Sequence, residues 1–255
     1  MNAIRVSAIN SFFDCSAKFN FQYIEKVPSP SRIALAFGTS IHAALKKNYA
    51  NKIFSKKDLS IEEITSEFSD NYDAEVKTVD FIPDDEEPQS FIKDAGVELL
   101  IKYQKDIAPR IQPLIVEQKI SLSFTNMPYE LSGTLDLIDE DNVLIDHKTT
   151  RKAFKQIPNG YARQISGYKY LAERMKIVVD STRIDMLTAK SAVTNTGIRH
   201  LPIETDLNEF LISFITASNG IEKGVFFPNR NSFLCNKKYC PFWNECEKKF
   251  GGKVK

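Results

Sequence analysis

The sequence lacks any apolar run of the roughly 18 residues that a transmembrane helix needs, so we expect no membrane-spanning segment. The first residues, MNAIRVSAINSFFDC, lack a basic start followed by an apolar core, and we expect no secretory signal and a cytoplasmic location. There is also no GxxxxGK[ST] phosphate loop. A helicase motor would therefore have to come from another polypeptide.

Cysteine is scarce, with four residues in a chain of 255. Cys15 stands alone near the start, whereas Cys235, Cys240 and Cys246 are grouped near the end. Disulfides are rare in reducing compartments. A metal or iron–sulfur site is therefore a better expectation than a disulfide framework.

Charge is nearly balanced, at +1 overall, which argues neither for nor against a nucleic-acid partner. Its distribution is uneven: residues 58–90 carry twelve acids and one base, and residues 223–255 carry eight bases and two acids. A basic segment can contact phosphates. A solvated tail and a solvated acidic insertion explain the two stretches equally well when each is taken alone.

The hydrophobic pattern divides the chain into helical and strand-like segments. We expect helices from Ser7 through Phe21, from near Thr39, within the acidic stretch, and over residues 89–106, 159–175 and 206–223. We expect strands over residues 114–124, 128–139 and 142–150, forming an antiparallel meander, and over residues 182–189 and 196–203. This order of elements predicts a mixed α/β fold.

Polar side chains gather on the expected meander. In a strand, residues two apart point to the same face, so Asp146 and Lys148 of VLIDHKTT share a face while His147 points to the other. The preceding strand brings Asp136 near the same edge across the hairpin, and Glu117 on the first strand can approach it too.

Such a group suits phosphodiester chemistry. Mg²⁺ prefers oxygen ligands, and two acids on adjacent strands can hold it against a phosphate. The metal would polarise the phosphate and help to generate hydroxide from water, and a lysine would orient that water or stabilise negative charge. The alternative is a surface hairpin with an ordinary salt bridge.

Three further polar residues have weaker signals of their own. His42 follows small residues in GTSIH, and a single helical histidine is usually a satisfied polar group. Gln164 and Tyr168, four residues apart, share one helix face and by themselves are ordinary, partly buried side chains.

Taken together, the segments GTSIH, GTLDLID, IDHK and QISGY occur in the order found in RecB-type nucleases. The chain thus resembles the PD-(D/E)XK superfamily over nearly its whole length, apart from the acidic stretch. The resemblance implies a restriction-endonuclease-like core, in which helices flank a mixed central sheet, with a helical N-terminal region and a cysteine-bearing C-terminal segment.

The resemblance also implies residue roles. His42, Asp136, Asp146 and the backbone carbonyl of His147 would bind Mg²⁺ or Mn²⁺. A second group would act on the substrate or support the site: Lys148 as the catalytic lysine, Gln164 and Tyr168 as site-supporting or DNA-contacting residues, and Glu117 at a less constant acidic position.

One branch of this superfamily carries a [4Fe–4S] cluster held by one early and three late cysteines. Cys15 and the segment CNKKYCPFWNEC are similar to that arrangement in CRISPR-associated RecB-like exonucleases, the AddB nuclease domain and exonuclease V. The spacing C-x4-C-x5-C departs from the commoner two-residue first gap. A zinc site made by the same four thiolates is the alternative.

The resemblance implies one RecB-like nuclease domain with an N-terminal region (1–38), an acidic helical insertion (58–90), a nuclease core (112–205) and a basic cysteine-containing segment (223–255). The expected activity is metal-dependent DNA exonuclease cleavage of single strands or DNA ends, in recombination, repair, phage DNA processing or CRISPR adaptation. The alternatives are a non-catalytic DNA-binding or assembly module beside a helicase or integrase partner, and cleavage of RNA.

Overall fold

The structure is a computed structural model that describes residues 2–29, 32–77, 89–150, 153–188 and 194–251. The longer helices in chain order are α1 (Val6–Asp14), α2 (Ser16–Phe19), α3 (Ile33–Ser55), α4 (Ile61–Lys77), α5 (Gln89–Asp106), α6 (Asn159–Arg174), α7 (Glu204–Glu222) and α8 (Trp243–Phe250). The strands are β1 (Ala3–Arg5), β2 (Pro113–Leu122), β3 (Glu130–Asp139), β4 (Val143–Thr150), β5 (Ser181–Thr188) and β6 (Thr194–His200). Two short turns of helix, Asn20–Ile24 and Ala108–Arg110, are also present in the described part of the chain.

The six strands of the described residues form one mixed sheet in the order β1-β3-β4-β5-β6, with β2 paired to β3. Strands β2, β3 and β4 are antiparallel neighbours, as the expected meander requires. Strands β4 and β5 are parallel, and α6 is the crossover between them, because parallel neighbours cannot be joined by a tight turn. The expected mixed α/β fold is thus confirmed.

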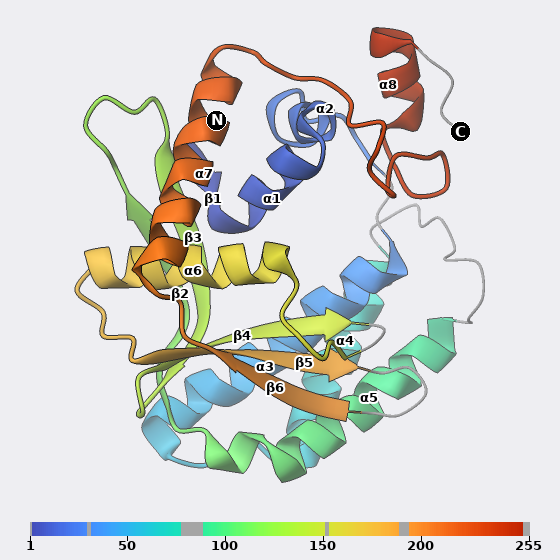
Figure 1. Ribbon diagram of the computed structural model, residues 1–255. Helices are drawn as coiled ribbons and strands as arrows, with labels where there is room; N and C mark the ends of the chain where they lie inside the picture. The colour runs from blue at the N-terminus through green and yellow to red at the C-terminus, as the bar shows by residue number, and fades with distance from the viewer. Residues whose placement is uncertain (1, 30–31, 78–88, 151–152, 189–193, 252–255) are drawn as a thin grey trace.

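Helices cover both faces of the sheet (Figure 1). Helices α3, α4 and α5 lie on one face, and their apolar residues form a core cluster with Val143 and Ile145 of β4. Helices α1, α6 and α7 lie on the other face, where the cluster includes Leu144 of β4. The alternation expected for β4 is therefore confirmed, and it places the side chains of this strand in two different environments.

The N-terminal region differs from the expectation of one helix from Ser7. A short strand, β1, comes first and pairs in parallel with the start of β3, and α1 begins at Val6. The helix then breaks at Cys15, whose backbone is extended and whose thiol accepts the backbone N–H of Lys18 to cap α2. Phe13, in the last turn of α1, is 42% exposed, and its ring lies beside the guanidinium of Arg163.

The acidic stretch is partly integrated into the fold. Helix α4 places Ile64, Phe68 and Tyr72 in the core cluster shared with α3 and α5, and its acidic residues lie on the outer side. The remainder of the stretch, residues 78–88, lies outside the described residues. Helix α3 starts at Ile33, well before the expected start near Thr39. Among the described helices, none combines the length and the apolar character needed to cross a membrane.

Candidate active site

The site lies along a stretch of β3 that has no paired strand on one of its two edges within the described residues. Strand β1 pairs with residues 130–132 of β3, and β4 pairs with the same strand only through Leu137 and Ile138. Between these two partners, residues 133–136 of β3 have no strand pairing on that edge within the described part of the chain. Asp136 stands at the end of this gap, where β4 separates from β3.

The side chain of Asp136 makes one of the hydrogen bonds that the backbone of a paired strand would otherwise make. Its Oδ2 accepts the backbone N–H of His147 at 2.9 Å. The same oxygen lies 3.7 Å from Nδ1 of His42 and 3.8 Å from Nδ1 of His147. The carboxylate thereby links β3, β4 and α3 at one point.

A nitrogen and two carboxylates converge at this point. One ligand atom each from His42, Glu117 and Asp136 lies within 4.8 Å of the other two. Glu117 has a left-handed backbone (φ 49°) in the middle of β2. Its neighbours Val116 and Gln118 pair with Leu137 and Leu135, the residues on either side of Asp136. Such a conformation is strained for a residue other than glycine, and it re-aims the side chain. His, Glu and Asp are together a suitable donor set for a divalent cation.

Asp146 and Lys148 form the second part of the site. Nζ of Lys148 lies 2.8 Å and 3.1 Å from the two carboxylate oxygens of Asp146. Asp146 is almost completely buried, at 4% exposure, whereas Lys148 retains partial access to solvent. The lysine ammonium is therefore the more accessible end of this pair.

Helix α6 supplies the polar residues above the pair. Nε2 of Gln164 donates to the hydroxyl of Tyr168 at 3.0 Å, and both side chains are buried. The ring of Tyr168 packs against β3 at Gly133, where an added Cβ would lie only 2.9 Å from it. A glycine at this position lets α6 approach the unpaired edge of β3 closely.

A second close approach brings α3 to the end of β4. A Cβ at Gly38 would lie 3.0 Å from the hydroxyl oxygen of Thr149. His42 is one turn further along α3 and lies on the same helix face as Gly38. The glycine in GTSIH thus allows the helix to carry His42 to the carboxylates.

The electrostatics favour capture of a cation. Burial, reinforced by the negative charge of Asp146, raises the pKa of Asp136 well above its usual value. Burial also raises the pKa of Glu117 and lowers that of His42. Acidic groups crowded in a half-buried site repel one another, and a divalent ion relieves this repulsion.

Lys148 behaves differently from these groups. Burial disfavours its charged form, but the nearby Asp146, Tyr168 and Asp136 outweigh that penalty and raise the pKa of Lys148 above its usual value. Burial, together with the negative charges of Asp146 and Asp136, raises the pKa of Tyr168. The lysine is therefore a permanent cation, suited to stabilising charge rather than to accepting a proton.

The ring of His147 points to the face of the sheet opposite Asp146 and Lys148, as the alternation of β4 predicts, and there it lies beside His42, with the ring centroids 6.2 Å apart. Its Nε2 lies 3.0 Å from the hydroxyl of Tyr103, which lies 2.7 Å from the hydroxyl of Tyr49. All three side chains are buried. The sequence pattern did not indicate either tyrosine, although Tyr49 is seven residues after His42 and therefore on the same face of α3.

The structure therefore gathers His42, Asp136 and Glu117 around one point and places Asp146, Lys148, Gln164 and Tyr168 beside it. The sequence matches the model of the PD-(D/E)XK nuclease superfamily over residues 4–247. This chain belongs to that superfamily.

The overall architecture is shared with a solved structure. A protein from Eubacterium rectale described as a "Putative exonuclease" superposes with a TM-score of 0.60, covering 99% of this chain and 90% of that chain at 11% identity. At that identity the likeness is one of fold. The structure of SSO0001 aligns with a TM-score of 0.38 at 14% identity, covering 96% of this chain and 98% of that chain. No curated protein sequence matches this chain.

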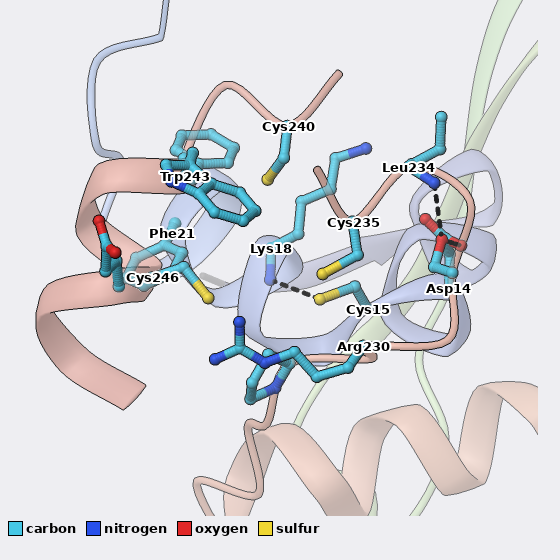
Figure 2. Close-up of a pocket in the computed structure, with 14 residues that line it drawn as sticks. Asp14, Cys15, Lys18, Phe21, Arg230, Leu234, Cys235, Cys240, Trp243 and Cys246 are labelled. Atoms are coloured by element: carbon cyan, nitrogen blue, oxygen red, sulfur yellow. Dashed lines mark hydrogen bonds between the residues drawn. The ribbon is translucent and has the colours of Figure 1, made fainter. Parts of the chain in front are cut away.

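This PD-(D/E)XK nuclease has a second group of possible metal-binding residues, its four cysteines. Figure 2 shows that the sulfur atoms of Cys15, Cys235, Cys240 and Cys246 point towards the same space. All four thiols are free, and together they line one pocket. Burial raises the pKa of the three late thiols, while Arg230 opposes this shift at Cys235 and Cys246.

The pocket joins two ends of the nuclease that are remote in sequence (Figure 1). The backbone N–H of Ala17 donates to the carbonyl of Phe227 at 3.1 Å, and the N–H of Phe227 donates to Oγ of Ser16 at 3.0 Å. Asn229 and Ser232 each donate a side-chain hydrogen bond to Asp14 at 2.9 Å. These bonds hold the segment that carries the late cysteines against α1 and α2.

Proposed function

We propose that this chain is a divalent-metal-dependent deoxyribonuclease that degrades single-stranded DNA or DNA ends as an exonuclease. The observation that carries the proposal is the convergence of His42, Glu117 and Asp136 beside the Asp146–Lys148 pair. A histidine and two half-buried acids within ligand distance, next to the lysine ammonium, form a site for holding a metal ion against a phosphate.

The donors fit Mg²⁺ or Mn²⁺ better than a softer metal, because carboxylate oxygens predominate. Asp136 and His42 would bind the ion, with Asp146 and the backbone carbonyl of His147 as the other ligands. Glu117 is placed to act as a further ligand. When bound, the ion would polarise the phosphate and offset its negative charge during attack by water.

Residues of the chain would perform the remaining steps. Lys148 would donate a hydrogen bond to the phosphate and stabilise the negative charge that grows as the water oxygen bonds to phosphorus and the ester bond breaks. Gln164 and Tyr168 would keep this lysine and the adjacent strand in position, since their hydrogen-bonded pair lies between α6 and the catalytic strands. Precise positioning of such groups accounts for a large share of the rate of phosphoryl transfer.

The exonuclease mode and the DNA substrate rest on the resemblance to RecB-type nucleases. The basic segment 223–255 supports a polyanionic substrate. A helicase or integrase partner, and a role in recombination, repair, phage DNA processing or CRISPR adaptation, belong to the same proposal.

We further propose that Cys15, Cys235, Cys240 and Cys246 hold a [4Fe–4S] cluster. Four thiols that line one pocket match the ligand set of such a cluster. The hydrogen bonds around Asp14 and Phe227 support the proposal, because they bring the early and late cysteines together. Zinc bound by the same thiolates is the competing assignment.

The nuclease proposal is tested with Asp146→Ala and Lys148→Ala. Each should abolish Mg²⁺-dependent release of nucleotides from end-labelled single-stranded DNA while the protein remains folded by circular dichroism. Lys47→Ala, which removes an exposed ion pair with Glu67, is the matched control and should cleave at the wild-type rate. A wild-type protein that binds DNA without cleaving it in Mg²⁺ or Mn²⁺ would instead indicate a binding or assembly module, and parallel RNA strands test the RNA alternative.

The cluster proposal is tested by anaerobic purification, a visible spectrum and analysis for iron and zinc. We expect a coloured protein with about four iron atoms per chain, and loss of the colour in Cys240→Ser. A colourless protein that contains stoichiometric zinc would replace the cluster with a zinc site.

A further inference from the structure

An aromatic pair stands beside the proposed catalytic lysine. The ring of Tyr161 lies 5.5 Å from Nζ of Lys148, measured to the ring centroid. The ring of Phe154 meets that of Tyr161 edge to face, with centroids 5.8 Å apart. Both side chains are partly exposed, so the pair borders the site rather than belonging to the core.

The pair is anchored to the catalytic elements on both sides. Tyr161 is in the first turn of α6, and it shares a face of that helix with Gln164 and Tyr168 because the three are spaced by three and four residues. The backbone N–H of Phe154 donates to the sulfur of Met186, and Met186 is the register partner of Lys148 across β4 and β5. The rings are thus tied to the two strands and the helix that build the site.

The start of α6 is held to α1 as well. Nδ2 of Asn10 donates to the carbonyl of Gly160 at 2.7 Å, and its Oδ1 accepts Nη1 of Arg163 at 2.9 Å. Arg163 also lies over the ring of Phe13, 5.4 Å from its centroid. Tyr161 is therefore on a helix end whose position is fixed by a second helix, which lowers the entropy cost of using it for binding.

The Tyr161 hydroxyl makes no hydrogen bond within the described residues. Because the side chain is partly exposed, its ring is accessible to a ligand. Beside that ring, Lys148 is the cation that would meet the phosphate, and the exposed Lys155 follows Phe154. A nucleotide presents the complementary groups, since its flat base is one sugar away from its phosphate.

We propose that Tyr161 and Phe154 form a stacking subsite for an unpaired nucleobase next to the phosphate that Lys148 contacts. The inference rests on the proposed nuclease function and deepens it, because it names the substrate class as an unpaired strand. A base in a duplex already has both faces covered by its neighbours, whereas a base in a single strand is free to stack on a protein ring. Stacking does not distinguish one base from another, so the subsite would be tolerant of sequence.

The experiment measures binding separately from cleavage. A fluorescein-labelled oligothymidylate and an abasic strand of the same length are titrated with protein by anisotropy, with Ca²⁺ in place of Mg²⁺. The abasic strand keeps every phosphate and sugar but has no base. Tyr161→Ala should weaken binding of the oligothymidylate by about tenfold and leave binding of the abasic strand within about twofold, and Phe154→Ala should act in the same direction.

Two controls make the result specific. Tyr161→Phe keeps the ring and should bind both strands like the wild type. Phe54→Ala removes an aromatic side chain that is 88% exposed on α3, and it should also leave both affinities unchanged. A duplex of the same length should respond to Tyr161→Ala no more than the abasic strand does.

Equal binding of oligothymidylate by Tyr161→Ala and wild type would overturn the subsite. An equal loss of affinity for the oligothymidylate and the abasic strand would also overturn it, because that result would indicate a disturbed Lys148 rather than a lost base contact. Either result leaves the nuclease proposal standing if the wild type cleaves DNA in Mg²⁺. A wild type that neither binds nor cleaves DNA would overturn the proposed function and the subsite together.

Discussion

Oδ2 of Asp136 accepts the backbone N–H of His147 at 2.9 Å, at the point where β4 separates from β3. A backbone donor that would otherwise lose its partner is thereby satisfied by a side chain that also belongs to the candidate metal site. The arrangement ties the direction of the His147 peptide to the position of the acid. Stability and ligand geometry are therefore coupled at this residue.

The first prediction concerns the charge of Asp136. Burial raises its pKa in the folded, metal-free protein, so the folded state binds more protons than the unfolded chain at pH values between the two pKa values. Stability should therefore fall as pH rises through that window. Asp136→Asn removes this cost, and we expect it to raise the free energy of unfolding at pH 7 by about 1 kcal/mol while abolishing cleavage.

Urea unfolding in EDTA at several pH values measures this effect. The difference between Asp136→Asn and the wild type should shrink as the pH is lowered towards 4, where an ordinary carboxyl is itself becoming protonated, at about 3.9. A variant that is less stable than the wild type at pH 7 would show that the attraction of the charged carboxylate to Lys148 and to the His147 N–H outweighs the cost of burying it.

Glu117 provides the second prediction. Its left-handed backbone re-aims a carboxylate towards His42 and Asp136, so Glu117→Gln should raise the Mg²⁺ concentration needed for half-maximal cleavage by about tenfold or more. Glu98→Gln, an exposed substitution on α5, is the matched control. An unchanged Mg²⁺ requirement in Glu117→Gln would remove this residue from the set of ligands.

The third prediction uses two glycines that contact α6 or belong to it. Gly133→Ala places a Cβ 2.9 Å from the Tyr168 ring and should displace it, lowering kcat by up to about a hundredfold. In Gly160→Ala the new Cβ meets Asn10 at an ordinary 3.5 Å, so the rate should change little. Steady-state cleavage compares the two, and equal rates would show that Tyr168 tolerates displacement.

The buried tyrosines give the fourth prediction. Tyr103 is the middle member of the chain from Tyr49 to His147, so Tyr103→Phe leaves two buried polar groups without their partner and should cost about 1–3 kcal/mol of stability. Tyr49→Phe removes only the outer member and should cost less. Denaturant unfolding of the two variants measures the difference, and a reversed order would mean that the hydrogen bond to His147 contributes little.

Local sequence patterns predicted the central part of this fold. The alternation in VLIDHKTT was enough to separate Asp146 and Lys148 from His147, and the hairpin placed Asp136 close to them. Strand β1 was missed because three residues cannot establish a periodicity, and its pairing depends on a free edge of β3. Short elements of this kind are defined by their partners rather than by their own sequence.

The contacts between helices and the sheet could not be predicted in the same way. Tyr103 reaches His147 only because α5 packs at a particular register over β4, and Tyr161 reaches Lys148 only because α6 crosses at the end of that strand. Helix periodicity gives the face on which a residue lies but not the neighbour that the face will meet. The aromatic residues beside the active site therefore became apparent only in three dimensions.

The position of the thiol pocket determines what oxidation of its cysteines would do to the fold. The two main core clusters draw their buried residues from Ile4 to Ile221, whereas Phe242 belongs to a separate small cluster with Ala17 and Phe21. The late cysteines thus pack on the surface of a domain whose two main core clusters contain no buried residue from their segment. We expect oxidation of these sulfurs to separate the C-terminal segment from α1 and α2 first, while the catalytic strands stay folded.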